Sequence, residues 1–182
     1  MSRPTRHSIC AASAVPRVHV FPSDLGWIAT AWRHERLYAL TFGYRSPQLA
    51  VTALGLPVDS LASDQSPHHD AFTKRLEAYA GGRADDFRDV PVVLDDFTDF
   101  QRRVYQRCRR IAYGSTLSYG ELAAAIGAPQ AARAVGHAMA RNRIPLVIPC
   151  HRVVGAAGAL GGFSAPDGIN MKRRLLSLEN RP

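Results

Sequence analysis

Cysteine is scarce in this chain, which has three in 182 residues, at Cys10, Cys108 and Cys150. An odd number without paired spacing argues against a disulfide framework, and a reducing compartment suits a thiolate nucleophile. No apolar run approaches the roughly 18 residues that span a bilayer, and Ile9 to Val15 is too short and too rich in Ala and Ser for a secretory signal. Internal repeats and low-complexity tracts are also absent. We therefore expect an intracellular globular protein without a membrane partner.

Acidic residues are scarce in the second half of the chain. Residues 1–96 carry ten Lys/Arg against eleven Asp/Glu, a net charge of −1, whereas residues 97–182 carry thirteen against four, a net charge of +9. A positive charge confined to one segment is expected of a surface that binds a polyanion, because contacts to phosphates release counterions. A basic surface kept for solubility explains the charge alone equally well.

The first 96 residues predict a small sheet followed by a helix. Residues 17–21, 26–32 and 37–42 are rich in β-branched and aromatic residues, and polar residues separate the last two segments, as in a β-hairpin. The pattern weakens over 43–66. A helix is predicted from about Asp70 to Ala80, where Gly81-Gly82 stops it, and 90–94 is a candidate further strand. The first 14 residues predict a mobile tail.

We place a domain boundary near residue 96. Phe100, Val104, Cys108 and Ile111 recur at helical spacing, which makes Cys108 a core residue of the first helix of the second half. The two halves, 1–96 and 97–182, are long enough for one small domain each.

A helix-turn-helix follows. Ser118 and Glu121 form a capping box that begins a helix ending at Gly127, and Pro129 predicts the first turn of a second helix that continues to Arg141. This second helix is built largely of Ala and Gly, with Arg133 as its one large cation before its end. Because a helix that reads the major groove normally carries several Arg, Asn or Gln, this composition suits a narrower groove and little sequence discrimination. Close packing of helices is the alternative.

The hexapeptide 148–153, Ile-Pro-Cys-His-Arg-Val, sets a cysteine beside a histidine and an arginine. Neighbouring cations and a hydrogen-bonded imidazole lower a cysteine pKa, and the thiolate is the attacking species. Pro149 restricts the residue before it, so 146–148 predicts a buried strand that delivers Cys150 to a fixed point. A structural cysteine at the end of a buried strand is the alternative.

Taken together, residues Phe100 to Glu179 resemble the O6-alkylguanine-DNA alkyltransferases (methylated-DNA–protein-cysteine methyltransferases). Three motifs carry the resemblance, at 113–123, 131–139 and 148–154. The first half is similar only in outline, through Leu25-Gly26-Trp27 and residues 79–83. The resemblance implies an α+β fold, with a small ribonuclease-H-like α/β domain at 1–96 and a mainly helical, winged-helix-like helix-turn-helix domain at 97–182.

The resemblance also implies a function. The family repairs double-stranded DNA by direct reversal, as a single-turnover methyltransferase that moves the alkyl group of O6-alkylguanine, and of O4-alkylthymine, onto its cysteine. Its helix-turn-helix enters the minor groove, and an arginine replaces the flipped nucleotide. We therefore expect a monomer without a cofactor or metal, located in the cytoplasm at the nucleoid or, in a eukaryote, in the nucleus.

The family's site residues have counterparts at matching positions. Cys150 is the acceptor, activated through a water by His151 and Glu179, and Tyr119 protonates N3 of the leaving guanine. Asn142 braces the site, and Ser164 with the carbonyls of Cys150 and Val153 holds the base. The groups expected at the DNA are Arg133 as the finger with Ala132, Ala134 and Gly136.

Some positions depart from the family pattern. Ala112 stands where many members have proline, and Tyr105 stands where many have tryptophan. The loop 163–166 differs from the commoner one beside the alkyl pocket, so the range of alkyl groups stays open. Cys10 with His7, His19 or His34 lacks a dense zinc-ligand spacing, and no set of N-terminal cysteines suggests a zinc switch.

Two other functions remain open at this point. A non-catalytic alkyltransferase-like lesion sensor would flip the base and recruit other factors, but those proteins lack the cysteine that this chain retains as Cys150. A helix-turn-helix transcription regulator with an incidental thiol should carry base-reading side chains on its second helix, which is nearly bare here.

Overall fold

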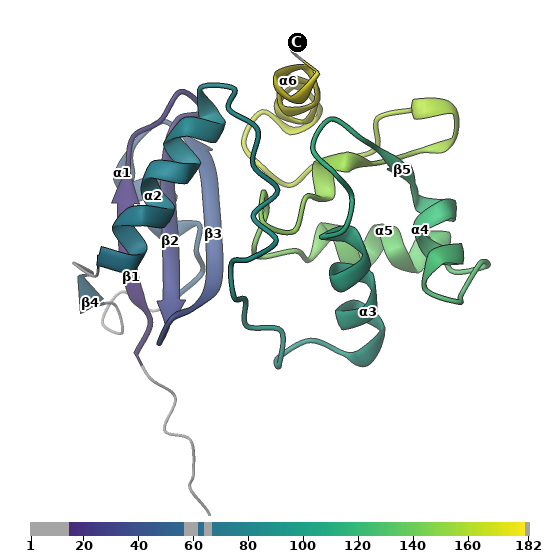
Figure 1. Cartoon of the computed structure of the whole chain (residues 1–182), viewed down its shortest axis with the longest axis horizontal. Coiled ribbons are helices and arrows are strands. Elements are labelled where there is room, and N and C mark those ends of the chain that lie inside the picture. Colours follow the sequence, from purple (N-terminus) through teal and green to yellow (C-terminus); the bar gives the residue numbers. More distant parts are fainter. Residues whose placement is uncertain (1–14, 57–61, 64–66, 181–182) are drawn as a thin grey trace, which may run out of the picture.

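The computed structural model describes residues 15–56, 62–63 and 67–180, which form a mixed fold of one sheet and several helices (Figure 1). The tail predicted at 1–14, with Cys10 and His7, lies outside the described residues. A single apolar core runs through both halves of the chain, from Trp32 and Leu40 in the sheet to Val104 and Ile148 in the helical part. No helix within the described ranges is long and apolar enough to cross a membrane.

The sheet has four strands in the order β3-β2-β1-β4. Strands β1 (Arg17–Phe21), β2 (Trp27–Arg33) and β3 (Arg36–Tyr44) are antiparallel neighbours, whereas β4 (Ala62–Ser63) runs parallel to β1. The three predicted strands and the hairpin between the last two are thus confirmed. His34 takes a φ of +56° in the hairpin turn, a backbone conformation that the short two-residue loop requires.

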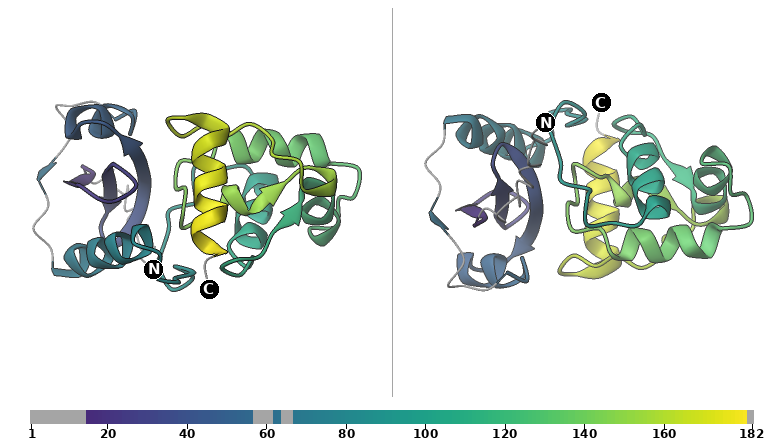
Figure 2. Two further views of the ribbon diagram at one scale, coloured as in Figure 1. Left: turned by 90° about the horizontal axis from the view of Figure 1, so that it is seen from above. Right: turned by 90° about the horizontal axis from the view of Figure 1, so that it is seen from below.

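Two helices cover opposite faces of this sheet (Figures 1 and 2). Helix α2 (Pro67–Ala80) is the predicted helix, although it begins three residues earlier than expected. Helix α1 (Pro47–Thr52) falls in the segment where the sequence pattern weakened and was not predicted. The sequence nevertheless contains signals for the start of this helix. The Ser46 side chain accepts a hydrogen bond from Leu49 N, and a proline occupies the first turn.

The strand predicted at 90–94 is wrong. This segment makes one isolated parallel bridge, between Leu37 and Val92, on the free edge of β3. Leu37 N donates to Pro91 O at 2.8 Å, and Val93 N donates to Leu37 O at 2.9 Å. Because Pro91 has no N–H, the ladder does not extend, and the segment crosses from the sheet to the helical half as irregular backbone.

The second half begins with α3 (Asp99–Cys108), which Thr98 and Gln101 start with a capping box. Helix α4 (Tyr119–Ala125) has the predicted Ser118–Glu121 box, and α5 (Ala132–Ala140) completes the helix-turn-helix. Helix α5 begins three residues later than predicted. Pro129 instead lies in a turn that Ala131 N closes on Ala128 O at 2.9 Å.

The strand predicted at 146–148 is also wrong, although all three residues are buried as expected. Leu146 has a φ of +69°, and Ile148 N donates to Ile144 O at 2.9 Å, so the chain turns tightly here. A short 3-10 helix, η2 (Cys150–Arg152), follows. The tight turn, rather than an extended strand, therefore fixes the position of Cys150.

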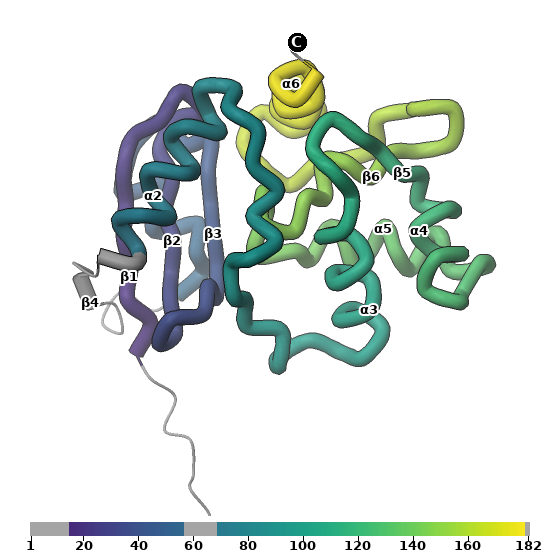
Figure 3. The backbone as a smooth tube through the Cα atoms, in the orientation of Figure 1, coloured from purple at the N-terminus to yellow at the C-terminus, as the bar shows by residue number. Residues whose placement is uncertain are grey.

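A small parallel sheet and the last helix complete the fold. Strand β5 (Leu117–Ser118) pairs with β6 (Val153–Val154), which ties the start of α4 to the residues after the cysteine. A second 3-10 turn, η3 (Ala156–Gly158), precedes α6 (Gly168–Glu179). The tube in Figure 3 shows α6 end-on, and Figure 2 shows its whole length between the sheet and helices α3, α4 and α5.

Candidate active site

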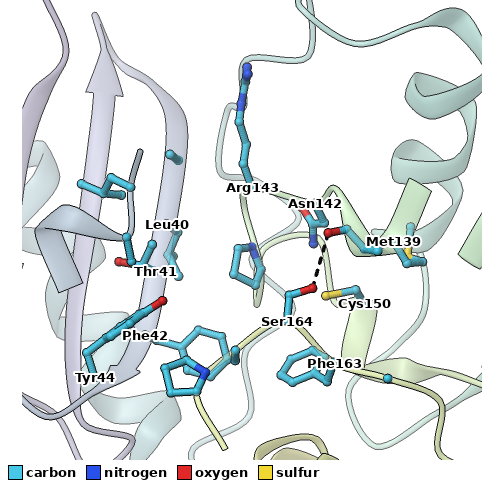
Figure 4. Close-up of a pocket in the computed structure, with 18 of the residues that line it drawn as sticks. Leu40, Thr41, Phe42, Tyr44, Met139, Asn142, Arg143, Cys150, Phe163 and Ser164 are labelled. Carbon is cyan, nitrogen blue, oxygen red and sulfur yellow. Dashed lines mark hydrogen bonds between the residues drawn. The ribbon is translucent and has the colours of Figure 1, made fainter. Parts of the chain in front are cut away.

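A cavity of about 540 Å³ opens beside Cys150 and is lined by both halves of the chain. Figure 4 shows Leu40, Thr41, Phe42 and Tyr44 of β3 along one side. The opposite side is formed by residues near the cysteine, namely Tyr119, Met139, Asn142, Phe163 and Ser164. The volume lies within the range of small-molecule pockets, so a single nucleobase fits.

The Cys150 thiol is buried, with 8% of the residue exposed, and stands at the first position of η2. Burial raises the pKa of this thiol, while the Asn142 amide and the Lys172 ammonium act in the opposite direction. Asn142 also fixes the turn, because its Nδ2 donates to Ile148 O at 2.8 Å and its Oδ1 accepts from Ile144 N at 3.0 Å. The cysteine is thus held rigidly and remains a thiol at neutral pH.

His151 is fully buried behind the cysteine and contacts Glu179, with 2.8 Å between Nε2 and Oε1. Because an ionised carboxylate only accepts hydrogen bonds, Nε2 must carry the proton and Nδ1 must be the free acceptor. Within the described part of the chain, Nδ1 has no hydrogen-bond partner. Burial lowers the pKa of His151, so the resting imidazole is neutral and can take a proton.

Glu179 lies at the end of α6 but is only 4% exposed. Its carboxylate accepts hydrogen bonds from Arg152, from the Tyr79 hydroxyl at 2.6 Å and from Gly114 N at 3.2 Å, besides His151. Burial alone would raise the pKa of Glu179, but the hydrogen bonds and the neighbouring cation outweigh it and lower the pKa to about 2. The carboxylate is therefore charged throughout the physiological range.

Tyr119 is half-buried at the first position of α4 and borders the cavity. A side chain on Gly161 would place its Cβ 3.0 Å from the Tyr119 hydroxyl, and one on Gly136 would lie 3.9 Å from the ring. Glycine at 161 therefore leaves room around this phenol, whereas a side chain at 136 would meet the ring only at ordinary contact distance. Gly136 also lines the cavity.

The expected base-holding groups lie nearby. Ser164 is exposed, and its hydroxyl donates to Ala140 O at 3.4 Å, the dashed line of Figure 4. Val153 is buried in β6, and its carbonyl accepts a hydrogen bond from Lys172 Nζ at 2.6 Å. Lys172 is itself fully buried, which lowers its pKa.

The other expected DNA contacts lie on the outer side of α5. Arg133 and Ala134 are exposed and Ala132 is half-buried, and none of them lines the cavity. Among the described residues, no group of three or more His, Cys, Asp or Glu could hold a metal ion. Cys108 is fully buried in the core, as predicted.

Sequence reasoning missed three buried polar residues around the site: Tyr79, Arg152 and Lys172. Arg152 was noticed beside the cysteine, but its pairing with Glu179 needs contacts across 27 positions. A signal for Lys172 did exist, because spacings of three and four place it on the same face of α6 as Leu175 and Glu179. For Tyr79, the only signal in the sequence is its position on the apolar stripe of α2.

Comparison with known proteins identifies the family. Residues 99–181 match the family model described as the DNA-binding domain of 6-O-methylguanine DNA methyltransferase. The methylated-DNA–protein-cysteine methyltransferase of Mycobacterium tuberculosis is 52% identical over 105 residues, which cover 58% of this chain and 61% of that protein. The chain therefore aligns with only about three fifths of that relative's length. The enzyme of the same name from Methanosarcina acetivorans is 38% identical over 160 residues, covering 88% of this chain and 96% of the relative.

Solved structures agree over the whole fold. The Mycobacterium tuberculosis OGT in complex with DNA has a TM-score of 0.73 and 37% identity, and the match covers 90% of this chain and 92% of that one. The O6-methylguanine-DNA methyltransferase of Pyrococcus kodakaraensis has a TM-score of 0.67 and 27% identity, with 91% and 99% covered. The family model, the archaeal relative and these structures together show that this chain belongs to the methylated-DNA–protein-cysteine methyltransferase family.

Proposed function

We propose that this chain repairs DNA by transferring the alkyl group of O6-alkylguanine, and of O4-alkylthymine, to the sulfur of Cys150 in a single turnover. The observation that carries the proposal is the Cys150 thiol at the wall of a base-sized cavity, with the buried His151–Glu179 pair behind it. A carboxylate that orients a neutral imidazole next to a thiol is the arrangement that activates a nucleophilic cysteine.

The thiol proton passes through a water to His151 Nδ1, and the thiolate attacks the alkyl carbon. The carbon–sulfur bond forms as the bond from carbon to O6 breaks, and guanine leaves with the electron pair. Tyr119 donates a proton to guanine N3, and the proton held on His151 replaces it. The net products are unmodified guanine and S-alkyl-Cys150, so the protein is consumed and no cofactor is needed.

DNA binding is proposed for the basic second half. The helix-turn-helix of α4 and α5, in a winged-helix-like domain at 97–182, enters the minor groove, and Arg133 takes the place of the flipped base. Exposure of Arg133 and Ala134 on α5 supports this arrangement. Ser164 and the carbonyls of Cys150 and Val153 then hold the extruded base in the cavity, and Asn142 braces the site.

The first half, residues 1–96, is proposed to be a ribonuclease-H-like domain, since α1 and α2 cover opposite faces of a mixed sheet. We infer that the protein acts as a monomer on double-stranded DNA, in the cytoplasm at the nucleoid or, in a eukaryote, in the nucleus. No step of the proposed reaction calls for a second subunit.

Transfer of label tests the function. Duplex DNA carrying radiolabelled O6-methylguanine is incubated with excess protein, and protein-bound label is counted. The proposal predicts one methyl group per chain and no turnover. A lesion sensor would bind the same DNA without acquiring label, and a transcription regulator would neither acquire label nor prefer the lesion.

A further inference from the structure

We propose that Tyr79, a residue of the first half of the chain, is a positioning residue that restrains the reactivity of Cys150 by acting through Glu179 and His151. The inference rests on the proton relay of the proposed function. It assigns to the N-terminal half a part in the chemistry, because Tyr79 lies outside residues 99–181 that match the family's DNA-binding domain.

The geometry of the Tyr79 hydroxyl carries the proposal. Tyr79 is 1% exposed near the end of α2, and its hydroxyl donates to Glu179 Oε1 at 2.6 Å. The same Oε1 accepts the His151 Nε2 proton at 2.8 Å, and the Tyr79 oxygen lies 3.4 Å from that nitrogen. The hydroxyl and the imidazole therefore share one carboxylate oxygen.

Other charged groups also face the Glu179–His151 pair and affect the pKa of His151. Arg152, from η2, donates to both oxygens of Glu179 and to Asp86, which lies between α2 and α3. Burial lowers the pKa of His151, and the charges of Arg152 and of Lys172, on α6, lower it further. Of these groups, the hydroxyl is the one from the first half that contacts Glu179 directly.

The sign of the effect follows from this sharing. A donor to Oε1 spreads the negative charge of Glu179 and so weakens its attraction for a protonated His151. The imidazole is then a poorer base, and Cys150 keeps its proton to a higher pH. For a protein that reacts once, a thiol that stays protonated until a base enters the cavity is less readily lost to other electrophiles.

The test compares two tyrosine hydroxyls that both join the halves of the full-length protein. Tyr79→Phe removes the hydroxyl on Glu179. Tyr113→Phe is the matched control, because that hydroxyl donates to the backbone oxygens of Gly82 and Leu178, and its ring packs against Tyr79. The rate of Cys150 alkylation by iodoacetamide is measured against pH by peptide mass mapping.

We expect the midpoint of the rate profile to move to lower pH in Tyr79→Phe and to stay at the wild-type value in Tyr113→Phe. Below the midpoint, the Tyr79→Phe rate should exceed wild type by roughly two- to tenfold, which corresponds to a displacement of about 0.3 to 1 pH unit. Unchanged profiles in both variants, or equal displacement in both, would overturn the proposal.

A second variant keeps the test valid if Tyr79→Phe does not fold. Replacing Tyr79 alone with 3-fluorotyrosine keeps the ring and strengthens the hydroxyl as a donor, so the midpoint should move to higher pH; movement to lower pH, or none, contradicts the proposal. Failure of the proposed function is distinguishable, because alkylation by iodoacetamide measures the reactivity of Cys150 without DNA. Loss of label transfer with an intact midpoint shift would refute the repair activity alone.

Discussion

Among single residues, the site depends on a buried ion pair between Arg152 and Glu179. Arg152, fully buried, donates to Glu179 and Asp86 and to Ile111 O at 2.7 Å. A buried ion pair of this kind contributes little net stability, but removal of one partner leaves the other charge buried and unpaired. Glu179 therefore orients His151 and also allows Arg152 to be buried.

The pKa of Glu179 leads to a prediction for stability. Its folded value of about 2 lies below the ordinary 4.5, so its contribution is complete above about pH 4.5 and is lost as the pH falls toward 2. Glu179→Gln should lower the free energy of unfolding at pH 7 by roughly 3 kcal/mol, with a deficit that shrinks as the pH falls below 4.5. Urea unfolding at several pH values measures this.

The control is Glu77→Gln, which changes an exposed glutamate on α2. That variant should unfold like wild type at every pH. A Glu179→Gln deficit that does not change between pH 7 and about pH 3 would show that lost packing, rather than the carboxylate charge, causes it.

At the scale of elements, local signals predicted starts and ends better than they predicted turns. The Ser118–Glu121 box and the hairpin at 33–36 depend on neighbours within a few positions, and both were predicted correctly. The turn at 146–148 was taken for a strand because buried turns and buried strands are equally apolar. Its shape depends on Asn142 and on Ile144, whose hydrogen bonds the apolar pattern does not reveal.

The site shows the same division. Motif residues near Cys150 were found from sequence, whereas Tyr79 reaches Glu179 across 100 positions and could not be found from local pattern. The side chain of Tyr105, which stands where many members of the family have tryptophan, is fully buried and donates to Ala138 O at 2.8 Å, so it ties α3 to α5.

Helix α5 carries its own prediction. If Arg133 replaces the flipped base, Arg133→Ala should slow repair of duplex DNA far more than reaction with free O6-benzylguanine, because only the duplex must be unstacked, at a cost of a few kcal/mol. Single-turnover rates on the two substrates measure the ratio. Arg141→Ala removes the same charge just beyond the helix and should leave the ratio near wild type. Equal slowing of both reactions by Arg133→Ala would refute the finger role.

At the scale of the whole molecule, charge and apolar packing are distributed differently. The core is continuous across both halves, but the net charge of +9 belongs to residues 97–182 alone. The basic half can therefore bind DNA while the first half supports the site from behind, through β3 at the cavity and α2 at Glu179.

This distribution predicts DNA binding that is sensitive to salt and nearly blind to sequence. Each neutralised phosphate should steepen the fall of log affinity with log salt by roughly 0.9 on duplex DNA, whereas base-specific contacts would discriminate by about 1–3 kcal/mol per base pair. Binding isotherms on scrambled, undamaged duplexes across a salt series measure both. A flat salt response would contradict binding through phosphates, and strong preference for one undamaged sequence would favour the regulator instead.

Peptide mass mapping after reaction with O6-methylguanine DNA identifies the residue that accepts the alkyl group. We expect one methyl group per chain, on Cys150, with Cys108 unmodified because it is buried in the core. Cys150→Ala should still bind DNA and should acquire no methyl group. Methylation of Cys108 or Cys10, or continued transfer to Cys150→Ala, would show that Cys150 is not the acceptor.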